Sequence, residues 1–522
     1  MGYDVGIFMV ALTVLVVSKI WRLVKISIWK PYALTRSFRR QGVSGPPYYL
    51  FSGSLNDWKR LKMDATQTVL DTNSNDITPR VLPHYHKWCQ QYGETILYWY
   101  GTRPVVCIAD PELTKQVLSN KFGFYVKPKC SPAIEALTGK GVAIVNGQEW
   151  VTRRRIVNPA FSVDKLKVMV KRMAPCIVSM LDEWRNQVNA AEDQSKTIEI
   201  NEEFRKLTSD IIAHTAFGSS YSRGKEAFEA QNELQHYCAA SVLDVLVPGS
   251  HYLPTASNRQ LWKLDRKIRN SLRQIIKSRL DSASSDCNYG DDLLGLMIEA
   301  SETDQNKDGL KLNMDDIVEE CKTFFFAGHE TSSNVLTWTI FLLSIHQDWQ
   351  TKLRQEVLEE CGSKIPDSDM LARLKLVHMV LLEVLRLYCP VVETFREATK
   401  DMKLGDLMIP KESWVCIPIT ELHRSKKYWG QDANEFNPSR FANGISKAAK
   451  HPNAFIAFGM GPRTCVGQNF AMLEVKTVIA MILQRFSFSI SPDYKHAPID
   501  NIALQPQFGI PIIFKTSPSG NI

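Results

Sequence analysis

Apolar residues recur with helical spacing over most of the chain, and a few short stretches alternate like strands. From Glu94 the residues Thr-Ile-Leu-Tyr-Trp-Tyr alternate, a turn follows at residues 101–104, and residues 105–109 form a second apolar run. This pattern predicts a β-hairpin. Asp110 and Pro111 then have the features of a helix start, a capping carboxylate followed by proline at the first helical position.

The remainder of the chain is mostly helical in period. Two polar stretches, residues 282–292 and 301–313, are predicted to be surface loops between helices. Strands return in short pieces near residues 415–419, 486–490 and 510–514. The expected architecture is therefore mainly α with small β-sheets.

An apolar run opens the chain. Residues 6–17 are apolar except for Thr13, and the run extends to Trp21 before Arg22. It is short for a bilayer core, which needs about 20 apolar residues, but flanking cations can snorkel toward the head groups. Asp4 precedes the run and the cations follow it, which is the reverse of a cleaved signal peptide. By the positive-inside rule we expect an uncleaved, single-pass membrane anchor with the body in the cytosol.

The expected domain organisation has three parts. Residues 1–30 form the membrane anchor, residues 31–48 form a basic and proline-containing hinge that ends near Gly45-Pro46-Pro47, and residues 49–522 form one large domain. No low-complexity linker, internal repeat or charge block divides this last part.

Composition narrows the functional class. Hydrophobic residues make up 44% of the 522-residue chain and charged residues 23%, which is typical of a globular protein. Eleven cysteines without C-x-x-C spacing indicate neither a disulfide framework nor a zinc site, and they fit a reducing compartment. A net charge of +8 without a nucleic-acid motif argues against nucleic-acid binding and favours membrane proximity or an acidic protein partner.

The clearest chemical signal is a glycine-rich loop that holds one cysteine. Residues 458–467 read Phe-Gly-Met-Gly-Pro-Arg-Thr-Cys-Val-Gly, and an apolar helical pattern follows from Asn469. The glycines let the backbone approach a flat partner closely, and the positive end of the helix favours a thiolate. Cys465 is therefore predicted to be a metal ligand, a thiolate on one face of a haem. The less specific interpretation is a buried cysteine in a glycine turn.

The pattern F-x-x-G-x-R-x-C-x-G is filled at Phe458, Gly461, Arg463, Cys465 and Gly467 and resembles the haem-binding signature of the cytochromes P450. The resemblance implies the P450 fold with an N-terminal transmembrane helix. It also implies haem b as cofactor, with Cys465 as the axial iron ligand and Phe458 and Arg463 among the residues that contact the haem.

Other arginines are candidates for contacts with the haem propionates. Trp150 and Arg154 lie on neighbouring turns of one helix face and are similar to the W-x-x-x-R motif of the family. By themselves they are equally compatible with a solvated basic face at residues 153–155. Arg396 joins Arg463 as a candidate, because two propionates should not remain unpaired in a low-dielectric pocket. His423 is a further residue near the expected propionates.

A long helix is predicted from Asn313 to about His346 by its capping residue and its apolar pattern. Gly328 in the middle of this helix costs stability, so it needs a reason. The surrounding A-G-x-E-T motif is similar to that of the P450 family. In the family this motif leaves room above the iron.

The resemblance further implies that Glu330 and Thr331 are catalytic and supply protons for O–O cleavage. The alternative is a kinked buried helix in which the Thr331 hydroxyl bonds to its own backbone. His329 is expected to be packed, or exposed on the far side.

Glu383 and Arg386 lie at i and i+3 in a helix that is apolar nearly all round, so the pair should be buried and needs further partners. The resemblance supplies Arg440 as the third member of a structural triad. Ser439 stands where an acidic residue is common in the family.

The expected substrate pocket is mostly apolar. By analogy with the family it includes Phe326, Ala327, Val391, Val392 and Leu504. Glu393 is a candidate hook for a polar group, although it is equally compatible with a solvent-facing position.

Three stretches, residues 44–49, 74–80 and 467–474, resemble the plant P450 clan that includes secologanin synthase, cytokinin hydroxylases, triterpenoid oxidases and some fatty-acid hydroxylases. The implied reaction is insertion of one oxygen atom from O₂ into a lipophilic plant metabolite, a terpenoid, hormone or fatty acid. NADPH-cytochrome P450 reductase would deliver the electrons from NADPH, at the endoplasmic reticulum membrane with the haem domain facing the cytosol.

Two other functions are compatible with a thiolate haem. One is an isomerase or dehydratase that rearranges a peroxide without a reductase. The presence of the Glu330-Thr331 pair argues against this function. The other is a non-catalytic haem sensor or carrier, which would consume no NADPH.

Overall fold

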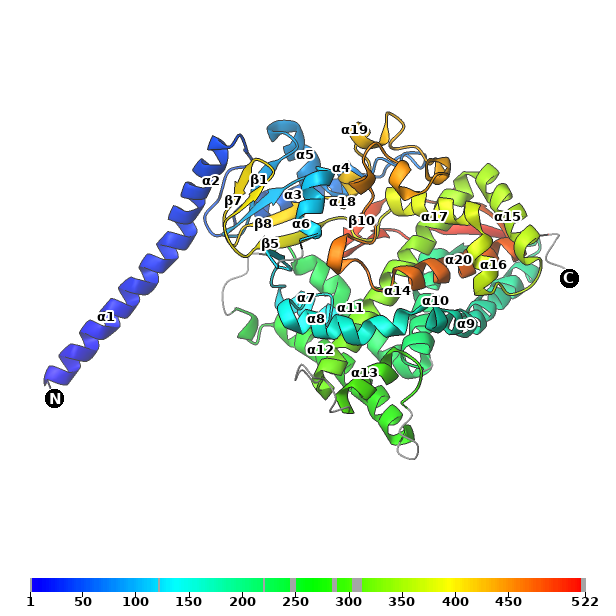
Figure 1. Cartoon of the computed structure of the whole chain (residues 1–522), viewed down its shortest axis with the longest axis horizontal. Coiled ribbons are helices and arrows are strands. Elements are labelled where there is room, and N and C mark those ends of the chain that lie inside the picture. Colours follow the sequence, from blue (N-terminus) through cyan, green and yellow to red (C-terminus); the bar gives the residue numbers. More distant parts are fainter. Residues whose placement is uncertain are drawn as a thin grey trace.

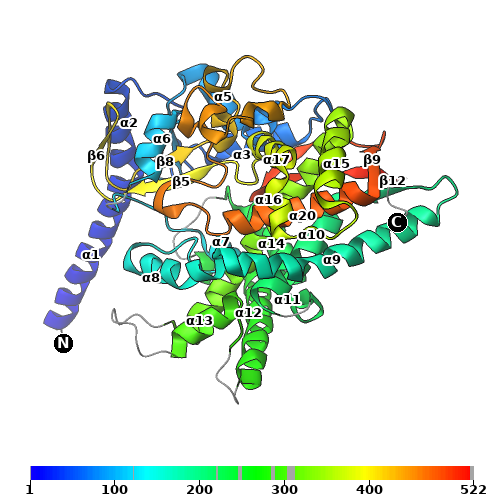
Figure 2. The same ribbon diagram turned by 45° about the vertical axis from the view of Figure 1, so that its right-hand side comes forward.

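A computed structural model describes residues 2–120, 123–218, 221–244, 250–283, 289–302 and 312–517. Helices make up most of the body, a β-rich part lies at one side, and the N-terminal helix projects away beside it (Figures 1 and 2). The mainly helical architecture with small sheets is confirmed. Of the two predicted polar loops, residues 284–288 and 303–311 lie outside the described residues, and the described residues 289–292 are irregular as predicted.

The largest sheet has five strands in the order β1-β2-β8-β5-β3. Its strands are β1 (Ile96–Tyr100), β2 (Arg103–Cys107), β8 (Trp414–Ile417), β5 (Thr394–Ala398) and β3 (Tyr125–Val126). The predicted hairpin is confirmed, with β1 and β2 antiparallel and Ile96 opposite Cys107. Strands β2 and β8 are parallel, whereas the other pairs are antiparallel.

Three smaller sheets complete the β-structure of the described residues. One has the order β4-β12-β9 and is built from β4 (Ser195–Glu199), β12 (Pro511–Thr516) and β9 (Phe486–Ile490). The others are hairpins of β6 (Met402–Leu404) with β7 (Leu407–Ile409) and of β10 (Pro498–Asn501) with β11 (Ala503–Pro506). Sequence analysis located β8, β9 and β12. It missed the short polar strands, because a stretch such as Ser-Lys-Thr-Ile-Glu in β4 becomes a strand only by pairing with distant β12.

Helix α14 (Met314–Ile345) runs through the helical part and is buried along most of its length. Its predicted start is confirmed as a capping box. Asn313 Oδ1 accepts from the Asp316 amide, and Asp316 Oδ2 accepts from the Asn313 amide. Helices that pack against α14 include α10 (Ile200–Ala216), α17 (Lys375–Leu387), α20 (Gln468–Arg485) and α12 (Ala256–Ala283).

The predicted helix cap is confirmed at α6, since Asp110 accepts hydrogen bonds from the amides of Glu112 and Leu113 at its start.

The other helices cover the sheets and the remaining faces of α14. These helices are α3 (Leu55–Thr66), α4 (Thr78–Val81), α5 (Pro83–Tyr92), α6 (Pro111–Leu118), α7 (Pro132–Thr138), α8 (Gly147–Val157), α9 (Val163–Asn189), α11 (Tyr221–Ser241), α13 (Leu293–Glu302), α15 (Gln347–Cys361), α16 (Ser368–Arg373), α18 (Ile419–Leu422) and α19 (Lys426–Trp429).

The N-terminal segment is one continuous helical rod. It comprises α1 (Gly2–Val24), a π-helical turn at Lys25–Trp29 and α2 (Lys30–Arg40), and the stretch 7–40 is long and apolar enough to cross a membrane. The described apolar residues of α1 are exposed, whereas Pro31 and Phe38 of α2 are buried against the body.

Residues 31–48, the predicted hinge, are helical as far as Arg40 and then pack onto β1, where the Leu97 amide donates to Ser44 O at 3.0 Å. A Cβ on Gly45 would lie 1.7 Å from the Leu97 carbonyl oxygen, so only glycine fits there. The rod is therefore attached directly to the five-stranded sheet.

Candidate active site

Cys465 lies in a tight loop just before α20. Gly459 and Gly461 have φ values of 74° and 73°, which favour glycine, and a Cβ on Gly461 would lie 2.5 Å from the carbonyl oxygen of Leu118. The Cys465 amide donates to Phe458 O at 2.9 Å, which closes the loop. The sulfur is thus held three residues before the first residue of α20, near the positive end of that helix.

The Cys465 side chain is accessible, and yet it is not in open solvent. The residue is exposed in the structure. Burial nevertheless raises the pKa of its thiol, while the amide of Gly467 and the Arg154 guanidinium act in the opposite direction. A backbone amide and a cation beside the sulfur favour the thiolate form that binds a metal.

Four cations, Lys127, Arg154, Arg396 and Arg463, gather at this loop. Burial and then the charges of Arg396 and Arg463 lower the pKa of Lys127 to about 7. Burial and then Arg396 and Arg154 lower the pKa of Arg463 to about 10, and burial lowers that of Arg396 to about 10. No acidic side chain among the described residues offsets these shifts.

Arg463 has an unused donor within this cluster. Its Nη2 donates to Val145 O at 2.6 Å and to Asn146 Oδ1 at 2.9 Å, and its guanidinium lies over the Trp150 ring at 4.7 Å. Its Nη1 is buried without a partner among the described residues. Buried cations with unused donors need an anion. The two propionates of a haem on the Cys465 side fit this requirement.

Sequence analysis missed Lys127. Strand β3 pairs with β5 so that Tyr125 lies opposite Ala398 and Val126 opposite Glu397. Continuing this register brings Lys127 beside Arg396. A single lysine after two strand residues carries no sequence signal, and only the pairing of distant strands places it here.

Helix α8 separates the roles of its adjacent arginines. Arg153 is buried and forms ion pairs with Glu320 at 3.1 Å and with Asp316 and Glu149 at 2.8 Å. Arg154 instead lies close enough to Cys465 to affect the pKa of its thiol. A solvated basic face at residues 153–155 therefore does not describe Arg153.

The A-G-x-E-T segment of α14 contains an accessible patch on an otherwise buried helix. Ala327 is exposed and Thr331 is half-buried, one turn apart. The Thr331 hydroxyl donates to Ala327 O at 2.7 Å, which is the backbone bond described above as the alternative. Gly328 serves packing against α10, since a Cβ there would lie 2.6 Å from Ile212 Cδ1. Of the two small residues, only Ala327 is exposed.

Glu330 is fully buried in a polar network. Its carboxylate pairs with Arg205 Nη2 at 3.1 Å and accepts from Gln235 Nε2 at 3.0 Å and from Gln505 Nε2. Burial raises the pKa of Glu330, but Arg205 and the neighbouring donors outweigh burial and hold this pKa below its usual value. Glu330 is therefore an ionised anchor between α14, α10, α11 and β11. His329 is packed, with a pKa that burial lowers to about 4.

The structure brings Glu383, Arg386 and Arg440 together. Arg386 contacts Glu383 through two bonds of 2.7 and 2.8 Å, and Arg440 Nε lies 3.6 Å from Glu383 Oε1. Arg440 also forms an ion pair with Asp432, which provides the carboxylate that is absent at Ser439.

His423 links this triad to the cysteine loop rather than to the cations. Its carbonyl oxygen accepts from Arg386 Nη1 at 2.9 Å, and its ring Nε2 accepts from the Ile456 amide at 2.9 Å.

The expected pocket residues fall into two groups. Ala327 is exposed, Val391 is 41% exposed and Phe326 is half-buried. Val392 and Leu504 are 4% and 0% exposed, so their side chains are packed in the core.

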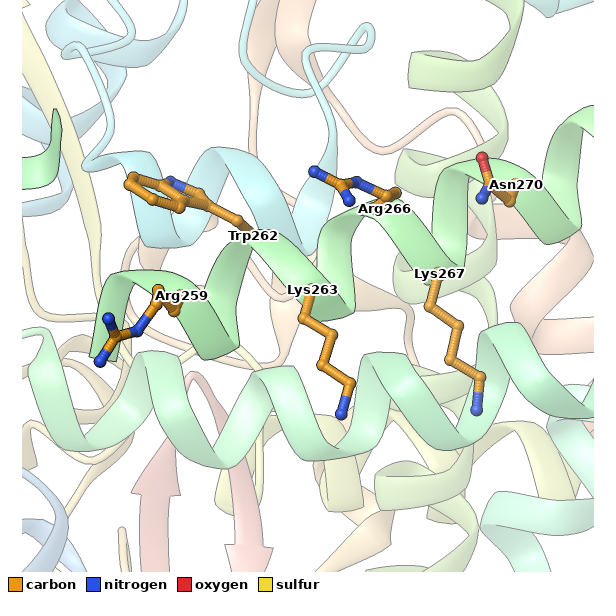
Figure 3. Close-up of a pocket in the computed structure, with 6 residues that line it drawn as sticks. All are labelled: Arg259, Trp262, Lys263, Arg266, Lys267 and Asn270. Atoms are coloured by element: carbon orange, nitrogen blue, oxygen red, sulfur yellow. The ribbon is translucent and has the colours of Figure 1, made fainter. Parts of the chain in front are cut away.

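A surface pocket of α12 is separate from the cysteine loop. Figure 3 shows its lining, which comes from α12 alone and contains none of the residues around Cys465. The lining residues are Arg259, Trp262, Lys263, Arg266, Lys267 and Asn270.

Comparison with known proteins establishes the family. The model of the family "Cytochrome P450" matches residues 76–512. The chain is 51% identical to cytochrome P450 709B1 of Arabidopsis thaliana, covering 99% of both chains. It is 43% identical to cytochrome P450 CYP72A616 of Paris polyphylla, covering 93% of this chain and 94% of the relative. A solved structure, retinoic acid-bound cyanobacterial CYP120A1, has the same fold, with a TM-score of 0.75 at 22% identity over 91% of this chain and 99% of that one.

The fold and the cysteine loop thus define a haem-thiolate protein, and the chain belongs to the cytochrome P450 family. It is a monooxygenase whose cofactor is a haem with thiolate-ligated iron and whose electrons come from a reductase. The predicted plant-type P450 is confirmed by the plant relatives.

Proposed function

We propose that this P450 inserts one oxygen atom from O₂ into a C–H bond of a lipophilic plant metabolite, a terpenoid, hormone or fatty acid. Electrons come from NADPH through NADPH-cytochrome P450 reductase. The observation that carries the proposal is an exposed Cys465 thiol beside four buried or half-buried cations that have no carboxylate partner among the described residues.

In this proposal the haem supplies the activation of O₂. Cys465 is its iron ligand, and the Gly467 amide, Arg154 and the end of α20 stabilise the thiolate. Lys127, Arg154, Arg396 and Arg463 hold the propionates.

Thr331 is the proton-handling residue of the site. Its hydroxyl lies on the accessible patch of α14 and can accept a hydrogen bond from a proton-carrying water while it donates to Ala327 O. Glu330 acts as a positioning residue, because its bonds to Arg205, Gln235 and Gln505 fix the helical turn that presents Thr331.

The exposed apolar rod at the N-terminus and the cations that follow it support the location. We place the protein in the endoplasmic reticulum membrane with a single pass and with the haem domain in the cytosol.

The test is turnover by membranes that contain this protein and a plant P450 reductase, supplied with terpenoids, fatty acids, cytokinins and gibberellins and read by mass spectrometry. A product heavier by one oxygen atom that forms only with NADPH supports the proposal. A rearranged product that forms from a peroxide without NADPH would contradict it.

A further inference from the structure

A cluster of polar side chains lies on the α3 and α5 side of the five-stranded sheet, away from the cations around Cys465. His84 Nε2 lies 3.9 Å from Glu393 Oε2, and the Cys416 thiol donates to the same carboxyl oxygen at 3.4 Å. Lys62 Nζ lies 4.0 Å from Asp500 Oδ2. The Tyr98 hydroxyl completes this polar cluster, which we define as Lys62, His84, Tyr98, Glu393 and Asp500.

Two members of the polar cluster have unused hydrogen-bonding atoms. Tyr98 is 1% exposed and His84 is 2% exposed, and neither the Tyr98 hydroxyl nor His84 Nδ1 has a hydrogen-bond partner among the described residues. The Cys416 sulfur beside Tyr98 is only a weak partner. Since buried polar atoms in native proteins are almost always paired, these atoms indicate a ligand or bound water.

The polar cluster can be reached from one side. The side chains of Lys62 and Asp500 are each 21% exposed, and that of Glu393 is 11% exposed. Val391, two residues before Glu393, is 41% exposed, while the intervening Val392 is buried. In extended backbone this alternation puts Val391 and Glu393 on the same side.

The polar cluster also connects to the catalytic helix. Asp500 precedes Asn501 at the tip of the β10–β11 hairpin, and Asn501 O accepts from Gln235 Nε2 at 3.1 Å. The same Gln235 amide donates to Glu330 at 3.0 Å. The tip that carries Asp500 is thus held against α11 and α14, next to the turn that presents Thr331.

The charges of the polar cluster nearly cancel at neutral pH. Burial, followed by the charge of Asp500, raises the pKa of Glu393 to about 8, so this carboxyl is mostly protonated. Burial lowers the pKa of His84 to about 3, so the ring is neutral. Burial raises the pKa of Asp500, and the positive charge of Lys62, 4.0 Å away, acts in the opposite direction. The remaining groups both donate and accept hydrogen bonds, as a hydroxyl group does.

We infer that Lys62, His84, Tyr98, Glu393 and Asp500 bind the hydroxyl group of a neutral, lipophilic alcohol and thereby determine which substrates the enzyme accepts. The inference deepens the proposed function and rests on it. Glu393 lies three residues before Arg396, about 10 Å along an extended chain, so the hydroxyl binds at a distance from the cations around Cys465.

The test compares two ligands of the holoenzyme, 5α-androstan-3β-ol and the hydrocarbon 5α-androstane. Their dissociation constants are measured by the spectral shift of the haem, without NADPH. We expect the alcohol to bind about 10-fold more tightly, the effect of one well-placed hydrogen bond. Glu393→Leu should bring the ratio of the two constants close to one without weakening the binding of the hydrocarbon.

Two variants separate recognition from folding. Glu393→Gln keeps a donor and an acceptor and should retain most of the preference for the alcohol. Glu397→Gln alters a carboxylate three residues past Thr394 in β5, where it accepts hydrogen bonds from Trp414 Nε1 and Arg103, and should leave the ratio unchanged. Equal affinity of both ligands for the wild type would show that the polar cluster holds only water and would overturn the inference. NADPH-dependent turnover in that case would still support the monooxygenase.

Discussion

At the scale of single residues, the site depends on groups that are accessible and desolvated at once. Cys465 is the clearest case, because the residue is exposed although burial raises the pKa of its thiol. Arg396 is buried, Lys127 and Arg463 are half-buried, and the described residues provide no carboxylate for these three cations. Such side chains destabilise the haem-free protein, and the protein becomes more stable when haem binds.

The role of Cys465 predicts the outcome of Cys465→Ser. A serine hydroxyl stays protonated and does not replace the thiolate, so the reduced carbon monoxide complex should lose its thiolate-type spectrum completely. A matched control is Cys361→Ser, since Cys361 lies buried in α15. Survival of the thiolate-type spectrum in Cys465→Ser would remove the ligand assignment.

Thr331→Ala tests proton handling. Loss of the hydroxyl should leave haem and substrate binding intact, lower product formation about 100-fold and divert NADPH electrons to hydrogen peroxide. Product, peroxide and NADPH are measured together. Thr339→Ala removes an equivalent hydroxyl two turns further along α14, where it donates to Val335 O at 2.6 Å. This variant should keep the wild-type coupling, that is, the amount of product formed per NADPH consumed. Unchanged coupling in Thr331→Ala would contradict the assigned role.

At the scale of elements, helices α14 and α17 carry charges inside the apolar core. Glu383 and Arg386 are both 0% exposed, and their pairing is what allows an apolar helix to hold them. Through His423 the same pair reaches the start of the cysteine loop, at the Ile456 amide. The loop geometry therefore depends on a salt bridge that is remote from the sulfur in the sequence.

Glu383→Gln leaves the Arg386 charge unpaired in the core. We expect a loss of about 3–5 kcal/mol in the free energy of unfolding, seen as a lower denaturant midpoint of the haem absorbance. The exposed pair Arg373–Glu360 offers a control. Glu360→Gln there should cost about 0–1 kcal/mol, because solvent screens that pair. Equal effects of the two substitutions would show that the buried pair is not structural.

At the scale of the whole molecule, helices α9, α14 and α20 meet around a carboxyl with no partner. Glu474 of α20 is 0% exposed, and neither of its oxygens accepts a hydrogen bond of good geometry among the described residues, although the Ser332 hydroxyl lies nearby. Burial raises the pKa of Glu474 to about 8. The folded protein therefore holds a proton on this group that the unfolded chain releases above about pH 4.5.

Stability linked to Glu474 is greatest at acidic pH and is lost as the pH rises toward 8. Glu474→Gln should remove this loss. The free energy of unfolding of the variant, relative to that of the wild type, should therefore rise by an amount on the order of 3 kcal/mol from pH 5 to pH 8. Denaturant midpoints at the two pH values measure the difference. Glu359→Gln, at an exposed position of α15, should follow the wild type. Parallel pH profiles of Glu474→Gln and wild type would contradict the expectation.

The class of protein and most of the helical framework follow from local patterns of residues along the chain. Local patterns sufficed where the physics is local, as in the β1–β2 hairpin, the Asp110 cap, the capping box of α14 and the glycine loop around Cys465. Each of these depends on residues within a few positions of one another.

Features that need partners from distant segments arise only when the chain is folded. The pairing of β3 with β5 places Lys127 beside Arg396, and the packing of α10 and α11 against α14 turns Glu330 into a buried anchor. The α3, α5 and β10 elements assemble the polar cluster around Glu393. Burial and pKa depend on all atoms around a group, so no local pattern in the chain encodes them.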